Sequence, residues 1–165
     1  MVTQRTENMT SFIVMDVLEK AHEMERKGLH VIHLEVGEPD FDAPTCVKQA
    51  MIAALDKGDT HYTHSLGMIE LREAICDHYH EQYDVAVTPD RVVVTSGTSP
   101  AMLSLFSVLI EPGDEVILSD PHYACYPNFI RFFGGKPVFI RTREQDGFQM
   151  DIRAIRNHLN HRTRA

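Results

Sequence analysis

A turn rich in hydroxyl groups and glycine lies between an apolar run and an apolar helical stretch, and it could bind an anion. Residues 92–95 are mostly β-branched and indicate a buried strand; Ser96, Gly97 and Thr98 follow, and Pro100 stands where a helix would begin. The unpaired N–H groups and the positive end of the dipole at a helix start favour a phosphate. Glycine lets a ligand approach the backbone closely. The pattern therefore predicts a phosphate cradle at the end of a strand.

The same turn also suits a plain helix cap. Serine and threonine are common N-cap residues whether or not a ligand binds. The pattern is neither a Walker loop nor a dinucleotide-binding fingerprint. Taken alone, the turn is consistent with either interpretation, so other parts of the chain have to decide between them.

Composition limits the classes of partner. The chain has 165 residues, of which 43% are hydrophobic, enough for one ordinary globular core. A formal net charge of -8 argues against a nucleic acid as partner. No apolar run is long enough to cross a bilayer, and residues 1–8 are polar and unlike a signal peptide. We therefore expect neither a nucleic-acid nor a membrane partner.

Cysteine and histidine usage points to a reduced protein without a metal. The cysteines Cys46, Cys76 and Cys125 are odd in number and form no C-x-x-C pair, which fits a cytoplasmic protein better than a disulfide framework. The ten histidines are scattered, and their close pairs lack a matching set of carboxylates or thiols. Because a tight metal site needs three or four converging ligands, we expect no metal.

The N-terminal part of the chain reads as helices joined by irregular segments. Apolar residues at helical spacing predict helices over residues 11–27, from near residues 42–44 to Gly58, and over about residues 68–83. A weak alternation over residues 31–36 predicts a short strand. It runs into residues 37–40, a turn by composition.

From residue 91 onward, strands and helices alternate. Three short apolar runs, at residues 92–95, 115–118 and 137–140, are separated by helical stretches at residues 100–110 and 123–133. This order is typical of an α/β domain with a mainly parallel sheet.

The last segment leaves the predicted sheet small. Asp151 is placed to cap a final helix, which leads into no further predicted strand. Open sheets usually have more than three strands, so we expect the chain to be part of something larger.

Five segments, in order and spacing, resemble the class I and II aminotransferases, which have the fold-type I architecture and use pyridoxal phosphate (PLP). Each motif is weak alone, but five in the right order are specific, and the match extends from about residue 11 onward. The segments are residues 33–41 (with the GEPDF signature), 61–67 with Glu70-Leu71-Arg72, 94–98, 111–116 (PGDEV) and 120–126 (a P-x-aromatic-x-x-Tyr stretch).

The resemblance implies an α/β fold, the N-terminal part of the PLP-dependent transferase (aspartate aminotransferase-like) fold, with an incomplete large-domain mixed sheet and flanking helices. Residues 1–41 would form an N-terminal arm and helix contributing to the small domain, and residues 42–165 the first part of the large PLP-binding domain. In the family's sheet, residues 92–95 would not lie next to residues 115–118. Such a partial sheet would expose strand edges and apolar faces.

The resemblance also implies cofactor-binding residues. Ser96, Gly97 and Thr98 match the turn that holds the cofactor phosphate. Tyr123 matches the aromatic residue that stacks on the pyridine ring. Tyr62 matches the tyrosine that reaches the cofactor phosphate of the other subunit, which implies a homodimer with shared active sites.

For some positions, both a role implied by the resemblance and a simpler structural role have to be considered. Gly37 matches the glycine whose backbone N–H meets the substrate carboxylate; without the resemblance it would be the first residue of a turn. Tyr62 could equally be a surface residue, and Tyr123 could begin a helix that packs on the sheet. The Asp120–Pro121 bond is expected to be cis. Arg72 is expected to make structural contacts and not to touch substrate.

Three residues that the family's chemistry needs have no match in the chain. These are the lysine that forms a Schiff base with the cofactor, the acid that keeps the pyridine nitrogen protonated, and the arginine that binds the substrate carboxylate. None of the lysines lies in the family's Ser-x-x-Lys context, so we expect the chain to be an N-terminal fragment without transaminase activity of its own. The lysines are Lys20, Lys27, Lys48, Lys57 and Lys136.

The leading hypothesis is a PLP-dependent aminotransferase that moves an amino group between an amino acid and a 2-oxo acid. A carbon–sulfur lyase or a decarboxylase of the same fold stays open, as does a non-catalytic domain that keeps a PLP or phosphate site as a regulator or remnant. A generic phosphate- or nucleotide-binding α/β domain would explain Ser96 and Thr98, but not Gly37, Tyr62 and Tyr123 together.

Overall fold

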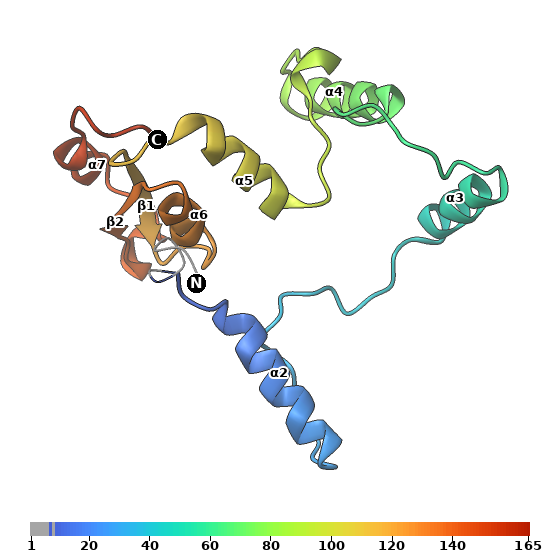
Figure 1. The fold of residues 1–165 in the computed structure, drawn as a ribbon, viewed down its shortest axis with the longest axis horizontal. Helices are drawn as coiled ribbons and strands as arrows, with labels where there is room; N and C mark the ends of the chain where they lie inside the picture. The colour runs from blue at the N-terminus through green and yellow to red at the C-terminus, as the bar shows by residue number, and fades with distance from the viewer. Residues whose placement is uncertain (1–6, 8) are drawn as a thin grey trace. The chain divides into compact units, whose positions relative to one another are not determined.

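The computed structural model describes Glu7 and residues 9–165 (Figure 1). The chain divides into two compact units, and each is described on its own. One combines the N-terminal segment up to Gly37 with Met102–Ala165, and we call it the sheet unit. The other is Glu38–Ala101, which we call the helical unit.

Two parallel strands form the sheet. Strand β1 (Glu115–Asp120) pairs in register with β2 (Lys136–Arg141), from Glu115 opposite Lys136 to Asp120 opposite Arg141. Parallel neighbours need a crossover, and helix α6 (Tyr126–Phe132) supplies it and packs on β2 (Figure 1). The predicted strand–helix–strand order from residue 115 onward is confirmed, and the pairing is parallel, as expected of a mainly parallel sheet.

The core of the sheet unit lies between the helices and β1. Phe106 of helix α5 (Thr98–Leu109) packs with Ile110, Val116 and the fully buried Ile130. A Cβ built on Gly135 would lie 2.8 Å from Cγ2 of Ile110, so a larger residue at this position would push the core apart.

Helix α7 (Ile152–His158) follows β2 and contacts it. The Asp151 side chain accepts a hydrogen bond from the Arg153 N–H at 2.9 Å, which confirms the predicted cap.

The last residues of the chain lie along the second edge of β1. The Glu115 N–H donates to the Arg162 carbonyl at 2.8 Å, and the Ile117 N–H donates to that of Ala165 at 2.9 Å. Arg164 Nε also contacts Asp114 Oδ2 at 3.0 Å. Strand β1 therefore has backbone partners on both of its edges.

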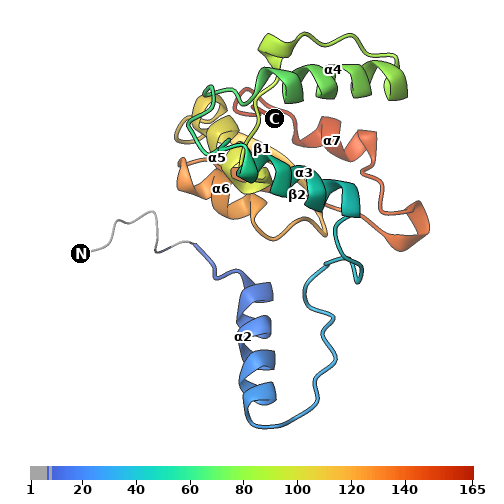
Figure 2. The same ribbon diagram turned by 90° about the vertical axis from the view of Figure 1, so that its right-hand side faces the viewer.

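Helix α2 (Ile13–Arg26) opens the sheet unit, close to the predicted residues 11–27. It ends at Arg26, and Gly28 just beyond it has a φ of 82°, which lets the Leu29 N–H turn back to the Met24 carbonyl at 3.2 Å. The chain then runs back along the helix (Figure 2).

The helical unit contains α3 (Thr45–Asp56), α4 (Ile69–Tyr83) and the short 3-10 helix η1 (Pro89–Arg91). Both α-helices lie within two residues of their predicted bounds. The left-handed Asp84, with φ of 52°, ends α4.

Two predicted strands are wrong. Residues 31–36 and 92–95 are extended or bent but belong to no ladder. Along residues 92–95, the backbone bond to another segment is the one from the Val94 N–H to the Leu66 carbonyl, 2.9 Å long. An apolar run becomes a strand only beside another strand, and the described residues give neither segment such a neighbour.

Two predicted helix starts are also wrong. Helix α5 begins at Thr98 and not at Pro100, because proline is tolerated throughout the first turn, where its missing N–H would have no partner. Helix α6 begins at Tyr126 and not at Tyr123, with Pro127 likewise in its first turn.

Apolar side chains are widely exposed, as predicted for a partial sheet. Leu34 is 89% exposed and Val108 is 80% exposed. Among the described residues, no helix combines the length and the apolar character needed to cross a membrane.

Candidate functional site

The turn at Ser96, Gly97 and Thr98 leads directly into α5. Gly97 has φ of 113°, in the region that favours glycine, and its carbonyl accepts a hydrogen bond from Thr95 Oγ1 at 2.7 Å. A Cβ built on Gly97 would meet nothing within 4 Å. The glycine is therefore required by the backbone conformation, and the space beside it is open.

The groups gathered at this turn are of the kinds that bind phosphate in proteins. Thr98 is the first residue of a helix of 12 residues, whose first N–H groups have no partner within the helix. Ser96 and Thr98 are exposed and add hydroxyl donors. Residues 95–99 include no carboxylate that would repel an anion. This donor set fits the phosphate of the cofactor that the sequence analysis implies.

A second motif of the helical unit braces this turn. The Val94 N–H donates to the Leu66 carbonyl, and the Val94 side chain fills the space beside Gly67. Arg72 is 8% exposed and donates from Nε to the Gly67 carbonyl at 3.2 Å and from Nη1 to the Pro89 carbonyl at 2.8 Å. The expected structural role of Arg72 is confirmed.

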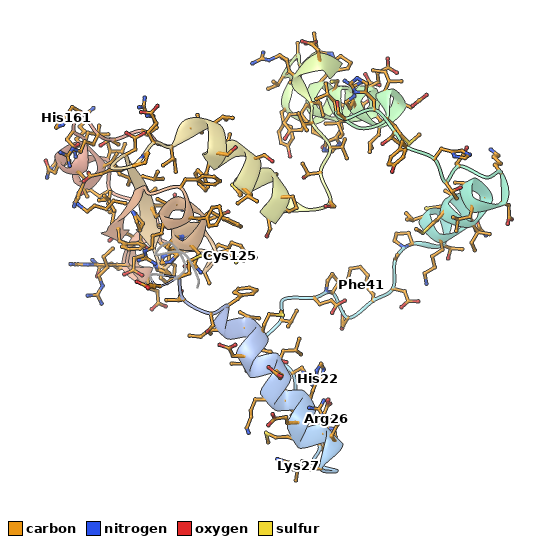
Figure 3. All side chains as sticks on the ribbon, viewed as in Figure 1. His22, Arg26, Lys27, Phe41, Cys125 and His161 are labelled. Carbon is orange, nitrogen blue, oxygen red and sulfur yellow. The ribbon has the colours of Figure 1, made fainter. Side chains whose placement is uncertain are left out.

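Tyr123 follows the C-terminal end of β1 in the sheet unit. The Asp120–Pro121 bond before it is cis, as predicted. Its ring is 47% exposed and meets the rings of Phe12 and Tyr126 edge-on, at centroid distances of 6.2 and 5.3 Å. A hydrogen bond with the thiol of Cys125, at the start of α6 (Figure 3), raises the pKa of Tyr123 above its ordinary value.

His122, beside Tyr123, was not singled out from the sequence. Its ring stacks on Phe139 with a centroid distance of 5.0 Å and an interplanar angle of 29°. Its Nδ1 atom is buried and has no hydrogen-bond partner among the described residues. A lone histidine in a turn carries no pattern that would have revealed this packing.

The other two predicted site residues lie in the open. Gly37 is exposed at the end of the sheet unit's N-terminal segment, and a Cβ built there would meet nothing within 4 Å. Tyr62, in the helical unit, is 107% exposed. Its side chain makes no hydrogen bond with any other residue that the structure describes.

Three of the five lysines are engaged in ion pairs. Lys20 contacts Glu23 at 3.0 Å, Lys136 contacts Glu115 at 3.0 Å, and Lys48 contacts Asp42 at 2.5 Å. Within residues 9–165 and Glu7, no group of three or more His, Cys, Asp or Glu side chains is arranged to hold a metal ion.

The family model and the sequence relatives that match the chain agree on one family. The family model for aminotransferase class I and II matches residues 30–165. The chain is 46% identical over 139 residues to the (5-formylfuran-3-yl)methyl phosphate transaminase of Methanocaldococcus jannaschii, covering 84% of this chain and 38% of that protein. It is 37% identical over 164 residues to the aspartate/prephenate aminotransferase of Thermus thermophilus, covering 99% and 43%.

Solved structures agree with the sequence matches. The aspartate aminotransferase from Thermus thermophilus with maleate superposes with a TM-score of 0.95 at 37% identity, covering 99% of this chain and 43% of that one. The chain therefore spans about two fifths of the length of the proteins that it resembles.

Proposed function

Because the chain belongs to the class I and II aminotransferase family, we propose that the whole protein is a PLP-dependent aminotransferase. It would move an amino group between an amino acid and a 2-oxo acid. Members of this family are PLP-dependent in general. The observation that carries the proposal is the open, donor-rich turn at Ser96, Gly97 and Thr98 at the start of α5. Bound PLP would withdraw electrons from the substrate's α-carbon.

The turn would hold the phosphate of the cofactor. The hydroxyls of Ser96 and Thr98 and the N–H groups of the first helical turn would donate hydrogen bonds to the phosphate oxygens. Gly97 would keep the backbone in the conformation that presents these donors, because its φ of 113° is strained for other residues.

Tyr123 would stack on the pyridine ring. A half-exposed ring already held edge-on by Phe12 and Tyr126 needs little reordering to accept a flat ligand. Its raised pKa supports a neutral phenol in this role.

Two exposed residues would act at the borders of the site. Gly37 would leave room for its backbone N–H to meet the substrate carboxylate. Tyr62, whose side chain is free of hydrogen bonds to the rest of the described chain, would reach the cofactor phosphate of a second subunit. The protein would then be a homodimer with shared active sites.

We propose the domain division that the family resemblance implies. Residues 1–41 would contribute to the small domain, and residues 42–165 would form the first part of the large PLP-binding domain. We propose that the 165-residue chain alone does not transaminate, because none of its five lysines lies in the family's Ser-x-x-Lys context. The odd number of cysteines supports a reducing location, the cytoplasm.

The relatives act on different substrates by name, an aspartate/prephenate pair in one and a furan methyl phosphate in another. We therefore propose the reaction class without a particular amino donor. The test is a screen of amino acids against 2-oxo acids with the whole protein and PLP. Formation of both a new 2-oxo acid and a new amino acid is expected. Release of sulfide or carbon dioxide without amino transfer would instead indicate a lyase or decarboxylase. Absence of turnover with every substrate would indicate a non-catalytic domain that binds PLP or phosphate.

A further inference from the structure

A histidine lies between two carboxylates where the chain turns back after α2. His33 Nε2 lies 3.0 Å from Glu25 Oε1, near the end of the helix, and its Nδ1 lies 2.6 Å from Glu35 Oε1. Neither glutamate was expected from the sequence to meet His33, and no site residue proposed above takes part in this cluster.

The geometry fixes the charge of the imidazole. A neutral imidazole has one N–H and one lone pair, so one of its nitrogens would face a carboxylate oxygen without a proton between them. Both contacts are hydrogen bonds only when both nitrogens carry a proton. His33 in this arrangement is therefore an imidazolium paired with two carboxylates.

The cluster extends to the backbone. The second carboxylate oxygen of Glu35 accepts a hydrogen bond from the Leu34 N–H at 2.9 Å. The Glu35 side chain is only 9% exposed, whereas those of His33 and Glu25 are 35% and 42% exposed. Protonation of His33 is thus linked to a hydrogen bond of the main chain in the returning segment.

The surroundings hold one more titratable group close to the imidazole. The ring of His22, on α2 (Figure 3), lies 5.8 Å from that of His33, centroid to centroid. The groups that face His33 are therefore His22 and Glu25 from the helix and Glu35 from its own segment. Beyond them, α2 and residues 31–35 line a shallow hollow of about 370 Å³. The His33–Glu25 pair joins the segment to the helix, and the His33–Glu35 pair lies within the segment.

We propose that His33 is a proton-operated latch, which holds residues 29–36 against the end of α2 while the imidazole is charged and releases them when it loses a proton. The latch does not depend on the proposed function, although the held segment leads to Gly37.

The titration sets the pH window of the latch. The hydrogen bonds with Glu25 and Glu35 raise the pKa of His33, and those with His33 lower the pKa of both glutamates. The contribution of His33 is complete below its ordinary pKa of about 6.5 and is lost as the pH rises through the raised value. The carboxylates remain ionised until the pH falls through their lowered values. The latch is closed between these two limits.

The first test measures the protonation of His33 in the whole protein. Exchange of the imidazole C2 hydrogen, followed by mass spectrometry over a pH series, reports the pKa of each histidine. We expect His33 to titrate above the ordinary histidine value of about 6.5. His30, a neighbouring exposed histidine of the same segment, supplies the matched control variant. In Glu25→Gln and Glu35→Gln the His33 transition should move down toward the ordinary value. A wild-type His33 that titrates at or below this ordinary value would overturn the proposal.

The second test measures the segment itself. Amide hydrogen exchange of a peptide covering residues 29–36, corrected for the intrinsic pH dependence, should be about two- to fivefold slower below the His33 transition than above it. His33→Gln should remove this pH dependence, and the matched variant His30→Gln should keep it. The same corrected pH profile in wild type and His33→Gln would refute the latch, whether or not the protein transaminates.

Discussion

Gly67 and Val94 are in direct contact across the helical unit: a Cβ built on Gly67 would lie 2.7 Å from the Val94 Cβ, closer than such atoms approach. Gly67 also has φ of 97°, a conformation that favours glycine. Since Val94 precedes the turn at residues 96–98 by two positions, this contact sets the position of the chain that enters the candidate phosphate site. The glycine of one motif thus supports the function of another.

Gly67→Ala is predicted to destabilise the whole protein by roughly 2–4 kcal/mol, because a backbone penalty and an overpacking penalty add. Denaturant unfolding measures the loss. Gly58→Ala is the matched control: Gly58 has φ of 80°, but a Cβ there meets nothing within 4 Å. It should therefore show only the smaller backbone penalty. Equal losses in the two variants would mean that the contact with Val94 costs nothing.

Arg72→Ala is predicted to cost about 1–3 kcal/mol of unfolding free energy, because it leaves the Gly67 and Pro89 carbonyls without their donor. Arg72→Lys should restore only part of the loss, since an ammonium cannot reproduce the planar fork. Arg91→Ala, a change at an exposed arginine of η1, is the control and should alter stability little. If the unfolding midpoint of Arg72→Ala equals that of the wild type, Arg72 does not stabilise this part of the helical unit.

Ser96→Ala and Thr98→Ala are each predicted to weaken PLP binding by about tenfold or more, because each removes a hydrogen bond to a charged phosphate. Equilibrium dialysis of the whole protein against PLP measures the dissociation constant. Ser107→Ala lies on the same helix, where its hydroxyl bonds the Ser104 carbonyl at 2.7 Å, and should bind as wild type does. If both turn variants bind PLP as tightly as the wild type does, the turn serves only as a helix cap.

Asp114 gives a pH-dependent prediction. Hydrogen bonds from the Glu111 N–H and from Arg164 Nε, both 3.0 Å long, lower the pKa of its carboxyl. A carboxyl with a lowered folded-state pKa adds stability above its ordinary value, and this contribution is lost as the pH falls through the lowered one.

Asp114→Asn should therefore be less stable than wild type at neutral pH, with a difference that shrinks as the pH falls below the ordinary aspartate value of about 3.9 and through the lowered one. Denaturant midpoints over a pH series check this. Asp146→Asn, at an exposed carboxylate of the 3-10 helix η2 (Glu144–Asp146), is the control and should alter stability little. A difference between Asp114→Asn and wild type that stays constant with pH would show that charge plays no part.

The sequence predicted correctly those strands and helices whose formation depends on residues close together in the chain. Residues 115–118 and 137–140 are apolar and adjacent through one crossover, so both became strands, in parallel. Residues 31–36 and 92–95 carry similar patterns without a strand beside them in the described chain, and propensity alone could not make them a ladder. Pro100 marked the first turn of α5 correctly but not its first residue, because any first-turn position tolerates proline.

The supports of the candidate site were harder to foresee. The role of Arg72 was anticipated, yet its acceptors, the carbonyls of Gly67 and Pro89, carry no side-chain signal. The pairing of His33 with Glu25, eight positions earlier, depends on how the chain reverses at Gly28. Contacts of this kind follow from backbone geometry, which composition and periodicity do not specify.

The most direct test of the central claim is a spectroscopic titration of the whole protein with PLP, followed by borohydride reduction. We expect an absorbance band near the edge of the visible range and a covalent adduct after reduction, both weakened in Ser96→Ala and Thr98→Ala. If wild-type protein shows neither the band nor a trapped adduct, the proposed aminotransferase function is contradicted.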